Sequence, residues 1–295
     1  MTGVFTLMPR RISLAIALFV VAAVFLFVLT RVVAQGTSAP ASSYYVALGD
    51  SIAHGHTADT VADDPQCHSQ KAPGYVCVVY RYLQTKYPDV QVRNFSRSGA
   101  DSCEVAGAGH GCQDMVPRVS QLVAADAFLK AHRGHIRLVT IDIGGNDILE
   151  LAVQGLSNLP ATEAKLPAAD ATLRTNLDTI FAELRVAAPH ARIVASTQWN
   201  PLGGLGTPPL PTGFPAAAQS ALDAINGITM VEAAKYKIKV ADAAAVMNAY
   251  PGGGVRLGYV IQTALIGTPN IHPTPKGHRI WGNTIIKTVF GPAAP

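Results

Sequence analysis

The sequence lacks several features that would place it in a common functional class. It contains no basic run and no interleaving of basic with aromatic residues, so nothing in it indicates nucleic-acid binding. No segment repeats along the chain, which excludes a repeat architecture. Charged residues make up only 14% of the 295 residues, and the net charge is +4. Residues 1–34 hold three arginines and no acid, so subtracting them leaves +1, and the domain that follows is nearly neutral.

One long apolar run is present near the N-terminus. Residues 12–30 carry no charge, follow the pair Arg10-Arg11 and precede a small residue, Ala34. This pattern predicts a secretory signal, although roughly 20 apolar residues also suffice to span a bilayer as an uncleaved anchor. We therefore expect a signal peptide or membrane anchor at 1–34, a short linker at 35–42 and one folded domain at 43–295. In both cases this domain lies outside the cytoplasm, secreted or anchored to the outer face of the membrane.

The chain has only four cysteines, and none of them forms a C-x-x-C spacing. An even number of cysteines in an exported protein predicts disulfides, for which three connectivities are possible. The favoured connectivity closes two short loops. It joins Cys67 to Cys77 and Cys103 to Cys112. A zinc site that also uses His68 and His110 is the alternative, but the spacing and the oxidising compartment disfavour it.

Strand-like and helix-like segments alternate after residue 43. The expected strands are 44–48, 90–95, 136–143, 191–197 and 238–241. The expected helices are 74–86, 114–129, 168–188, 216–236 and 274–290. Strands that alternate with helices in this way predict an α/β fold, with a parallel sheet covered on both faces.

Small and polar residues follow the first three expected strands, where reactive groups gather in such sheets. Ser51 follows the first strand, Gly99 the second and Asn146 the third, while His272 precedes the last helix. Each residue has an ordinary structural role available to it, as a turn, a helix cap or a loop position. Their joint order instead favours ester hydrolysis, with Ser51 as nucleophile and His272 as base. The Ser51 amide, the Gly99 amide and the Asn146 side chain would then bind the oxyanion.

Other groups near these residues allow further interpretations. Asp50, His54 and His56 have metal-ligand chemistry, but we favour an Asp50 that packs within the turn and two histidines that face solvent. The apolar segment 258–267 would wall an acyl pocket, move as a lid or pack on the core. The segment 199–214, rich in proline and glycine, is long enough to line a substrate cleft.

Four short blocks resemble those of the GDSL or SGNH hydrolase family, of the secreted esterase and lipase type. The blocks are residues 49–55, 94–99, 143–148 and 272–278. Their combination is specific, whereas no single block is. The resemblance implies a flavodoxin-like three-layer α/β/α fold with a central, mostly parallel five-stranded sheet. It also implies ester hydrolysis through serine without a cofactor, and two loop disulfides similar to those of secreted relatives.

One position departs from the family pattern. The family usually has an aspartate three residues before the catalytic histidine, and here that position is Pro269. A backbone carbonyl within residues 267–270 is the favoured group to orient His272, because a neutral acceptor also fixes the tautomer. The Asn270 side chain and Asp242 are weaker candidates.

The sequence thus predicts an extracytoplasmic serine carboxylic ester hydrolase. We expect a monomer that acts on lipid or small acyl esters, without a metal or cofactor, and that touches a membrane only through residues 12–30 if these are uncleaved. A carbohydrate O-acetyl esterase or acyltransferase with the same serine is the close alternative. A catalytically silent cell-surface binding protein is the alternative from another class. An α/β-hydrolase is disfavoured because the serine lacks a Gly-x-Ser-x-Gly context and follows the first strand.

Overall fold

The computed structural model describes residues 42–57, 63–107, 120–201, 212–249 and 272–294. Ser42–Pro295 forms one compact unit. No helix in the described ranges is long and apolar enough to cross a membrane, and the apolar run 12–30 lies outside them. The boundaries expected at residues 34 and 42 stay a prediction.

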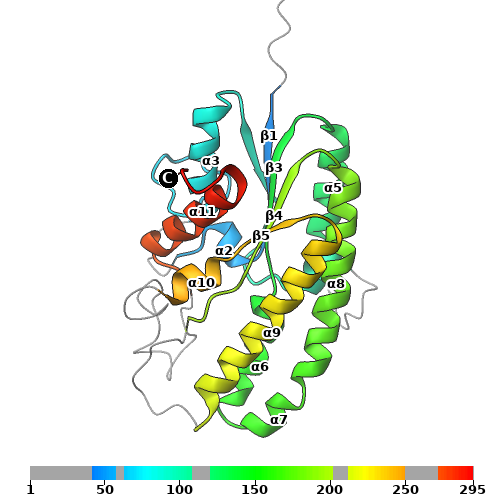
Figure 1. The fold of residues 1–295 in the computed structure, drawn as a ribbon, viewed down its shortest axis with the longest axis vertical. Helices are drawn as coiled ribbons and strands as arrows, with labels where there is room; N and C mark the ends of the chain where they lie inside the picture. Colours follow the sequence, from blue (N-terminus) through cyan, green and yellow to red (C-terminus); the bar gives the residue numbers. More distant parts are fainter. Residues whose placement is uncertain (1–41, 58–62, 108–119, 202–211, 250–271, 295) are drawn as a thin grey trace, which may run out of the picture. The chain divides into compact units, whose positions relative to one another are not determined.

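Five parallel strands form the central sheet (Figure 1). They are β1 (Tyr44–Gly49), β2 (Gln91–Asn94), β3 (Ile136–Asp142), β4 (Arg192–Ser196) and β5 (Lys239–Ala241). Their order across the sheet is β2-β1-β3-β4-β5, and every neighbouring pair is parallel. This is the flavodoxin-like order, in which the chain crosses back over β1 between β2 and β3. The expected α/β fold is confirmed, and each expected strand agrees with the observed one to within one residue at either end.

Helices lie on both faces of the sheet. They are α2 (Ser51–His54), α3 (Tyr75–Lys86), α4 (Ser102–Ala106), α5 (Gln121–Ala131), α6 (Gly145–Gly155), α7 (Leu159–Glu163), α8 (Leu166–Ala187), α9 (Phe214–Lys235), α10 (Ala243–Asn248) and α11 (Pro275–Phe290). The five expected helices correspond to α3, α5, α8, α9 and α11. Helices α2, α4, α7 and α10 are too short to show a helical period, and α6 begins with two residues that favour turns, Gly145 and Asn146.

One expected helix begins later than the sequence pattern indicated. The segment 114–129 was expected to be helical, but α5 starts at Gln121. The reason is a cap: the Ser120 hydroxyl accepts a hydrogen bond from Val123 N at 3.1 Å. Residues 114–119 lie outside the described ranges.

The side chains of β1 alternate between two apolar cores, one on each face of the sheet. Val46 and Leu48 belong to the core that α5, α8 and α9 cover. Tyr45 and Ala47 belong to the opposite core, which α3 and α11 cover. Figure 1 shows these two helix layers on either side of the strands. The three-layer arrangement therefore follows from the two-residue period of a strand that is buried on both faces.

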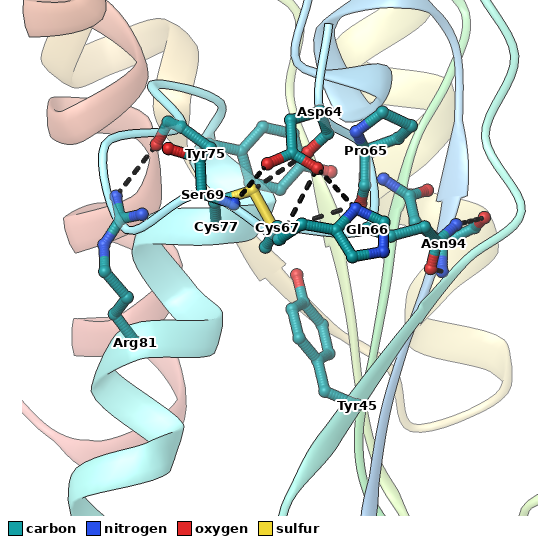
Figure 2. Close-up of a disulfide and its surroundings, with 12 residues drawn as sticks. Tyr45, Asp64, Pro65, Gln66, Cys67, Ser69, Tyr75, Cys77, Arg81 and Asn94 are labelled. Carbon is teal, nitrogen blue, oxygen red and sulfur yellow. Dashed lines mark hydrogen bonds and ion pairs between the residues drawn. A yellow bond between two sulfur atoms is a disulfide. The ribbon is translucent and has the colours of Figure 1, made fainter.

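A disulfide fastens the loop that precedes α3 (Figure 2). It joins Cys67 to Cys77, as predicted, with Cα atoms 5.3 Å apart. Cys103 is also disulfide-bonded, and its expected partner, Cys112, lies outside the described ranges. The side chain of Gln66, next to the first cysteine, exchanges hydrogen bonds of 2.8 and 3.2 Å with the backbone of Asn94. The disulfide loop is therefore attached to the carboxyl end of β2.

Candidate active site

The turn after β1 requires glycine at its first position. Gly49 has a φ of 136°, and a Cβ there would lie 2.2 Å from the carbonyl oxygen of Asp142 on β3. The following residue, Asp50, caps α2 by accepting a hydrogen bond from Ile52 N at 2.8 Å. Ser51 is therefore the first residue of a helix at the carboxyl end of a strand. Backbone amides at such a position have no partner within the helix and are available to an anion.

The side chain of Gln121 holds the same turn from the edge facing β2. The pairing of β2 with β1 ends at Asn94 opposite Ala47, so β2 does not reach Gly49. Gln121 Oε1 accepts a hydrogen bond from Gly49 N at 2.9 Å, and Gln121 Nε2 donates one to Gly49 O at 2.8 Å. This buried amide replaces the missing strand. Nothing in the sequence marks the role, because a polar residue in the first turn of an amphipathic helix is ordinary.

The histidine that precedes α11 meets the serine that follows β1. His272 Nε2 lies 2.8 Å from Ser51 Oγ, although the two residues are 221 positions apart. Thr274 caps α11 by accepting a hydrogen bond from Gly277 N at 3.1 Å, which fixes the start of the helix three residues after His272. Burial, with smaller effects of His56 and His278, lowers the pKa of His272 to about 4. The imidazole is therefore neutral at pH 7 and able to accept a proton.

The loops that follow β2 and β3 contact each other, and the loop after β2 also contacts the turn after β1. Arg97 N donates a hydrogen bond to Gly49 O at 3.0 Å, which ties the loop after β2 to the turn that carries Ser51. In that loop Gly99 has a φ of 80°, and among the described residues no heavy atom outside its chain neighbours lies within 4 Å of where its Cβ would be. Asn146 Nδ2 donates to Ala100 O at 2.8 Å, so one amide hydrogen of Asn146 is used to hold this loop. Asn146 was expected as an oxyanion donor or a helix cap; the cap of α6 is Gly144.

Two buried carboxyl groups, those of Asp50 and Asp142, and the half-buried carboxyl group of Asp147 lie close to these residues. We call Asp50, Asp142 and Asp147 the acidic floor. Burial raises the pKa of Asp50 to about 7 and that of Asp147 to about 6. Burial, together with the neighbouring charge of Asp50, also raises the pKa of Asp142 well above its ordinary value. Elevated carboxyl pKa values close to a nucleophile are typical of active sites.

The neighbours of the acidic floor are neutral hydrogen-bond donors. Asp142 Oδ1 accepts hydrogen bonds from Gln198 Nε2 and from Ser196 Oγ, the latter at 3.3 Å. Asp147 accepts hydrogen bonds from the backbone amide and the hydroxyl of Ser102. The sequence shows that Asp142 is an acid at the end of the apolar run 136–143. It does not show that Asp142 lies near Asp50, because that depends on the order of the strands.

The model of the GDSL-like lipase/acylhydrolase family matches residues 47–280. The chain belongs to this family. Its fold is similar to that of an extracellular lipase from Streptomyces rimosus, at 21% identity and a TM-score of 0.59, over 84% of this chain and 100% of the lipase. A phospholipase A1 from Streptomyces albidoflavus NA297 has 22% identity and a TM-score of 0.59 over the same shares. A lipase from a goat rumen metagenome, Lip_vut3, has 16% identity and a TM-score of 0.58, over 85% of this chain and 99% of that one.

A comparison with curated protein sequences finds no match. Because these three solved relatives are below 25% identity, their likeness shows the fold, and the family model shows the class of enzyme. As a member of the GDSL-like lipase/acylhydrolase family, the chain is a carboxylic ester hydrolase. The resemblance read from the four sequence blocks is confirmed.

The proposed metal interpretations do not fit the side chains of this family member. His54 Nδ1 lies 3.0 Å from Ser96 O, and His56 Nδ1 lies 3.0 Å from Asp63, so neither histidine joins Asp50 in a cluster. Both histidines have partners, whereas we expected them to face solvent. Within the described ranges no three metal-ligating side chains gather. The disulfide uses both sulfur atoms of Cys67 and Cys77, which removes them as zinc ligands.

Asp242, a weaker candidate to orient His272, is engaged elsewhere. Its carboxylate caps α10 by accepting a hydrogen bond from Ala245 N at 3.1 Å, and it accepts another from Thr197 Oγ1 at 2.9 Å. The favoured carbonyl at 267–270, Pro269 itself and the apolar segment 258–267 lie outside the described ranges. Of the segment 199–214, the two ends are described, and Trp199 and Phe214 are both buried.

Proposed function

We propose that the protein hydrolyses carboxylic esters with Ser51 as nucleophile and His272 as general base. The observation that carries the proposal is the 2.8 Å separation of Ser51 Oγ and His272 Nε2. A nucleophile and its base within hydrogen-bond reach are the geometric requirement for covalent acyl transfer. The low pKa of His272, about 4, supports the role because it leaves Nε2 unprotonated at neutral pH.

The reaction has two balanced halves. Ser51 Oγ attacks the ester carbonyl carbon while its proton passes to His272 Nε2, and the resulting imidazolium returns that proton to the departing alkoxide. The products of this half are an alcohol and an acyl-serine. Water then attacks the acyl-serine, His272 accepts a proton from the water, and the same proton restores the Ser51 hydroxyl as the acid leaves.

Three donors are proposed to bind the oxyanion that forms in each half. They are the Ser51 amide, the Gly99 amide and the Nδ2 group of Asn146. The Ser51 amide is supported by its position in the first turn of α2, and Gly99 by the open space beside its Cα. Asn146 keeps one amide hydrogen beyond the one it gives to Ala100 O. Loss of one oxyanion donor typically lowers kcat by roughly a hundredfold or more.

We propose an extracytoplasmic location for this enzyme, secreted or anchored by residues 12–30. Support comes from the disulfide between Cys67 and Cys77, since such bonds persist in oxidising compartments, and from the signal-like N-terminal sequence. The intact mass of the exported protein tests whether residues 1–34 are removed. The proposed monomer is tested by light scattering of the same preparation.

The experiment that tests the mechanism compares three proteins on p-nitrophenyl esters of increasing acyl length. Wild type should hydrolyse them, and Ser51→Ala should lose activity by at least about a thousandfold, as expected when the nucleophile is removed. Ser157→Ala is the matched control, because Ser157 lies on an exposed turn where its hydroxyl bonds only Gln154 O. Its kcat should equal that of wild type.

A serine-directed phosphonate gives an independent readout. It should label wild type and Ser157→Ala on one residue, and it should not label Ser51→Ala. A wild type that cleaves no ester and takes no label would overturn the mechanism and favour the binding-protein alternative. Preference for acetyl over longer chains would instead indicate an O-acetyl esterase, whereas preference for long chains or a phospholipid would indicate a lipase.

A further inference from the structure

A second histidine contacts the ring of His272. The centroids of the His56 and His272 rings are 4.3 Å apart, and the ring planes meet at 70°, an edge-to-face arrangement. His56 comes from the turn after α2, five residues beyond the serine whose proton His272 accepts. The family resemblance assigns this residue no role, and the metal interpretation that involved it does not fit the structure.

The backbone N–H and C=O groups of His56 both form hydrogen bonds. Its amide donates a hydrogen bond to Ser51 O at 2.9 Å, so it follows any movement of the serine turn. Its carbonyl lies 2.9 Å from Nε2 of His278, a fully buried residue on α11. Because Tyr75 N donates to His278 Nδ1 at 3.2 Å, the His278 proton resides on Nε2, which donates it to His56 O. His278 therefore connects the helix that follows His272 to the turn that carries His56.

The side chain of His56 is bound to a carboxylate. Its Nδ1 lies 3.1 Å from Asp63 Oδ1 and 3.0 Å from Asp63 Oδ2. The His56 side chain is 41% exposed and that of Asp63 is 24% exposed, so the pair lies at the rim of the site rather than in its interior. These contacts hold the negatively charged carboxylate of Asp63 on the ring that contacts His272.

That charge favours the protonated form of His272, and the other neighbours oppose it. Burial has the largest influence and lowers the pKa of His272, and His56 and His278 lower it further. Among the described residues that act on this pKa, Asp63 alone raises it. A stronger base accepts the serine proton more readily, so a group that raises this pKa assists the proposed reaction.

We propose that His56 and Asp63 form a positioning pair for His272. The His56 ring sets the angle of the His272 ring, and the carboxylate of Asp63, held on His56, stabilises the imidazolium that forms when Ser51 loses its proton. This inference rests on the proposed function. No proton moves to Asp63: the serine proton stays on His272 Nε2 until the leaving group takes it, and His56 keeps its proton on Nδ1. The pair thus provides negative charge in a chain that has Pro269 where its family usually has aspartate.

The test removes the negative charge of Asp63 and keeps the size and shape of its side chain. Asp63→Asn should lower kcat on a p-nitrophenyl ester by about tenfold with little change in KM, the size expected for one partly exposed charge near the imidazolium. The pKa of His272, followed by NMR of its ring protons, should fall below the wild-type value of about 4. Asp63→Glu, which restores the charge, should recover most of kcat.

The chain supplies a matched control one residue away. Asp64 also pairs with a histidine, since His68 Nδ1 lies 3.1 Å from Asp64 Oδ1, but this second pair lies on the disulfide loop. Asp64→Asn should leave kcat and the pKa of His272 unchanged, even if it lowers the melting temperature. A merely structural role for Asp63 would lower the melting temperature and leave the pKa of His272 in place.

The outcomes separate this inference from the proposed function. If wild type hydrolyses the ester and Asp63→Asn keeps both the wild-type kcat and the wild-type pKa of His272, the inference of a positioning pair is wrong and the proposed function stands. Wild type that neither hydrolyses the ester nor reacts with the phosphonate overturns the proposed function first. A folded His56→Phe variant keeps a ring against His272 without binding Asp63. It should lose as much kcat as Asp63→Asn, and an undiminished kcat also contradicts the pair.

Discussion

The pKa values of carboxyl groups shift in opposite directions in the acidic floor and on the outer surface of α8 and α9. In the floor, burial raises the pKa values of Asp50, Asp142 and Asp147, and none of the described groups that act on them is a lysine or arginine. On the outer surface, Asp178 accepts hydrogen bonds from Tyr236 and Lys235, and these partners lower its pKa. The same side chain is thus held in its neutral form in one region and in its charged form in the other.

Solvent explains the difference. An ion pair on the surface forms between charged groups that water already stabilises, so it contributes little to the free energy of unfolding. A carboxylate in the floor has lost its water, so its charged form is costly and a proton is retained instead. In the floor, Asp142 accepts a hydrogen bond from the neutral amide of Gln198, whereas on the surface Asp178 pairs with Lys235.

The strongest test of this contrast removes a neutral amide from the region of the floor. Gln121→Leu leaves the buried N–H of Gly49 without its partner, and we expect the free energy of unfolding to fall by about 3 kcal/mol. Because the same turn presents Ser51, kcat should fall by about tenfold or more. Urea unfolding and ester hydrolysis measure the two effects.

A matched glutamine provides the control for this change. The Gln154 side chain is half-buried, and within the described residues its hydrogen bonds go to Glu150 and Lys165 at the surface, so Gln154→Leu should leave stability and kcat near the wild-type values. Equal losses in both variants would mean that the position of Gln121 under the serine turn has no special importance.

A smaller effect is expected when one buried acid becomes an amide. The pKa of Asp50 rises from 3.8 to about 7 in the fold, so the folded state prefers the protonated form. The contribution of Asp50 to stability is therefore full below about pH 4 and is lost as the pH rises toward about 7. Asp142→Asn keeps the acceptor for Ser196 and Gln198 but removes the neighbouring charge.

Asp142→Asn should therefore be more stable than wild type at pH 8, by about 2 kcal/mol, and nearly equal to it at pH 4. Thermal unfolding across this pH range measures the difference. Stability curves that run parallel for the two proteins would show that the fold does not raise the pKa of Asp142.

The smallest effect is expected on the outer surface. The side chain of Asp178 is 47% exposed and that of its partner Lys235 is 49% exposed, so Asp178→Asn should change the melting temperature by no more than the error of the measurement, and kcat should not change. Added salt should reduce even this difference. A large loss of stability at low salt would contradict the distinction between the floor and the surface.

The sequence predicted the elements of the fold because their signals are local. The apolar run Ile136–Asp142 and the apolar face of Leu166–Ala187 each show their period within a single segment. The order of the serine and histidine along the chain predicts them as a catalytic pair, which stays a prediction, and their side chains lie 2.8 Å apart. The start of α5 was missed because a single hydroxyl, that of Ser120, decided it.

The groups that support the site could not be read from the sequence. Gln121 lies 72 positions from the Gly49 peptide that it holds, and Asp142 meets Asp50 only because β3 lies beside β1. The contacts of His56 could not be predicted for the same reason, since its partner Asp63 and the ring of His272 reach it from different segments.

By itself, the sequence determined the alternation of strands and helices, the family and the residues at the strand ends, because periodicity and short blocks are properties of neighbouring residues. Only the tertiary structure decided which carboxyl groups are buried, which amide completes the turn at Gly49 and which ring rests on His272. Burial and pairing between distant segments depend on how strands are ordered in the sheet, and that order is set by the packing of the whole domain rather than by any one segment.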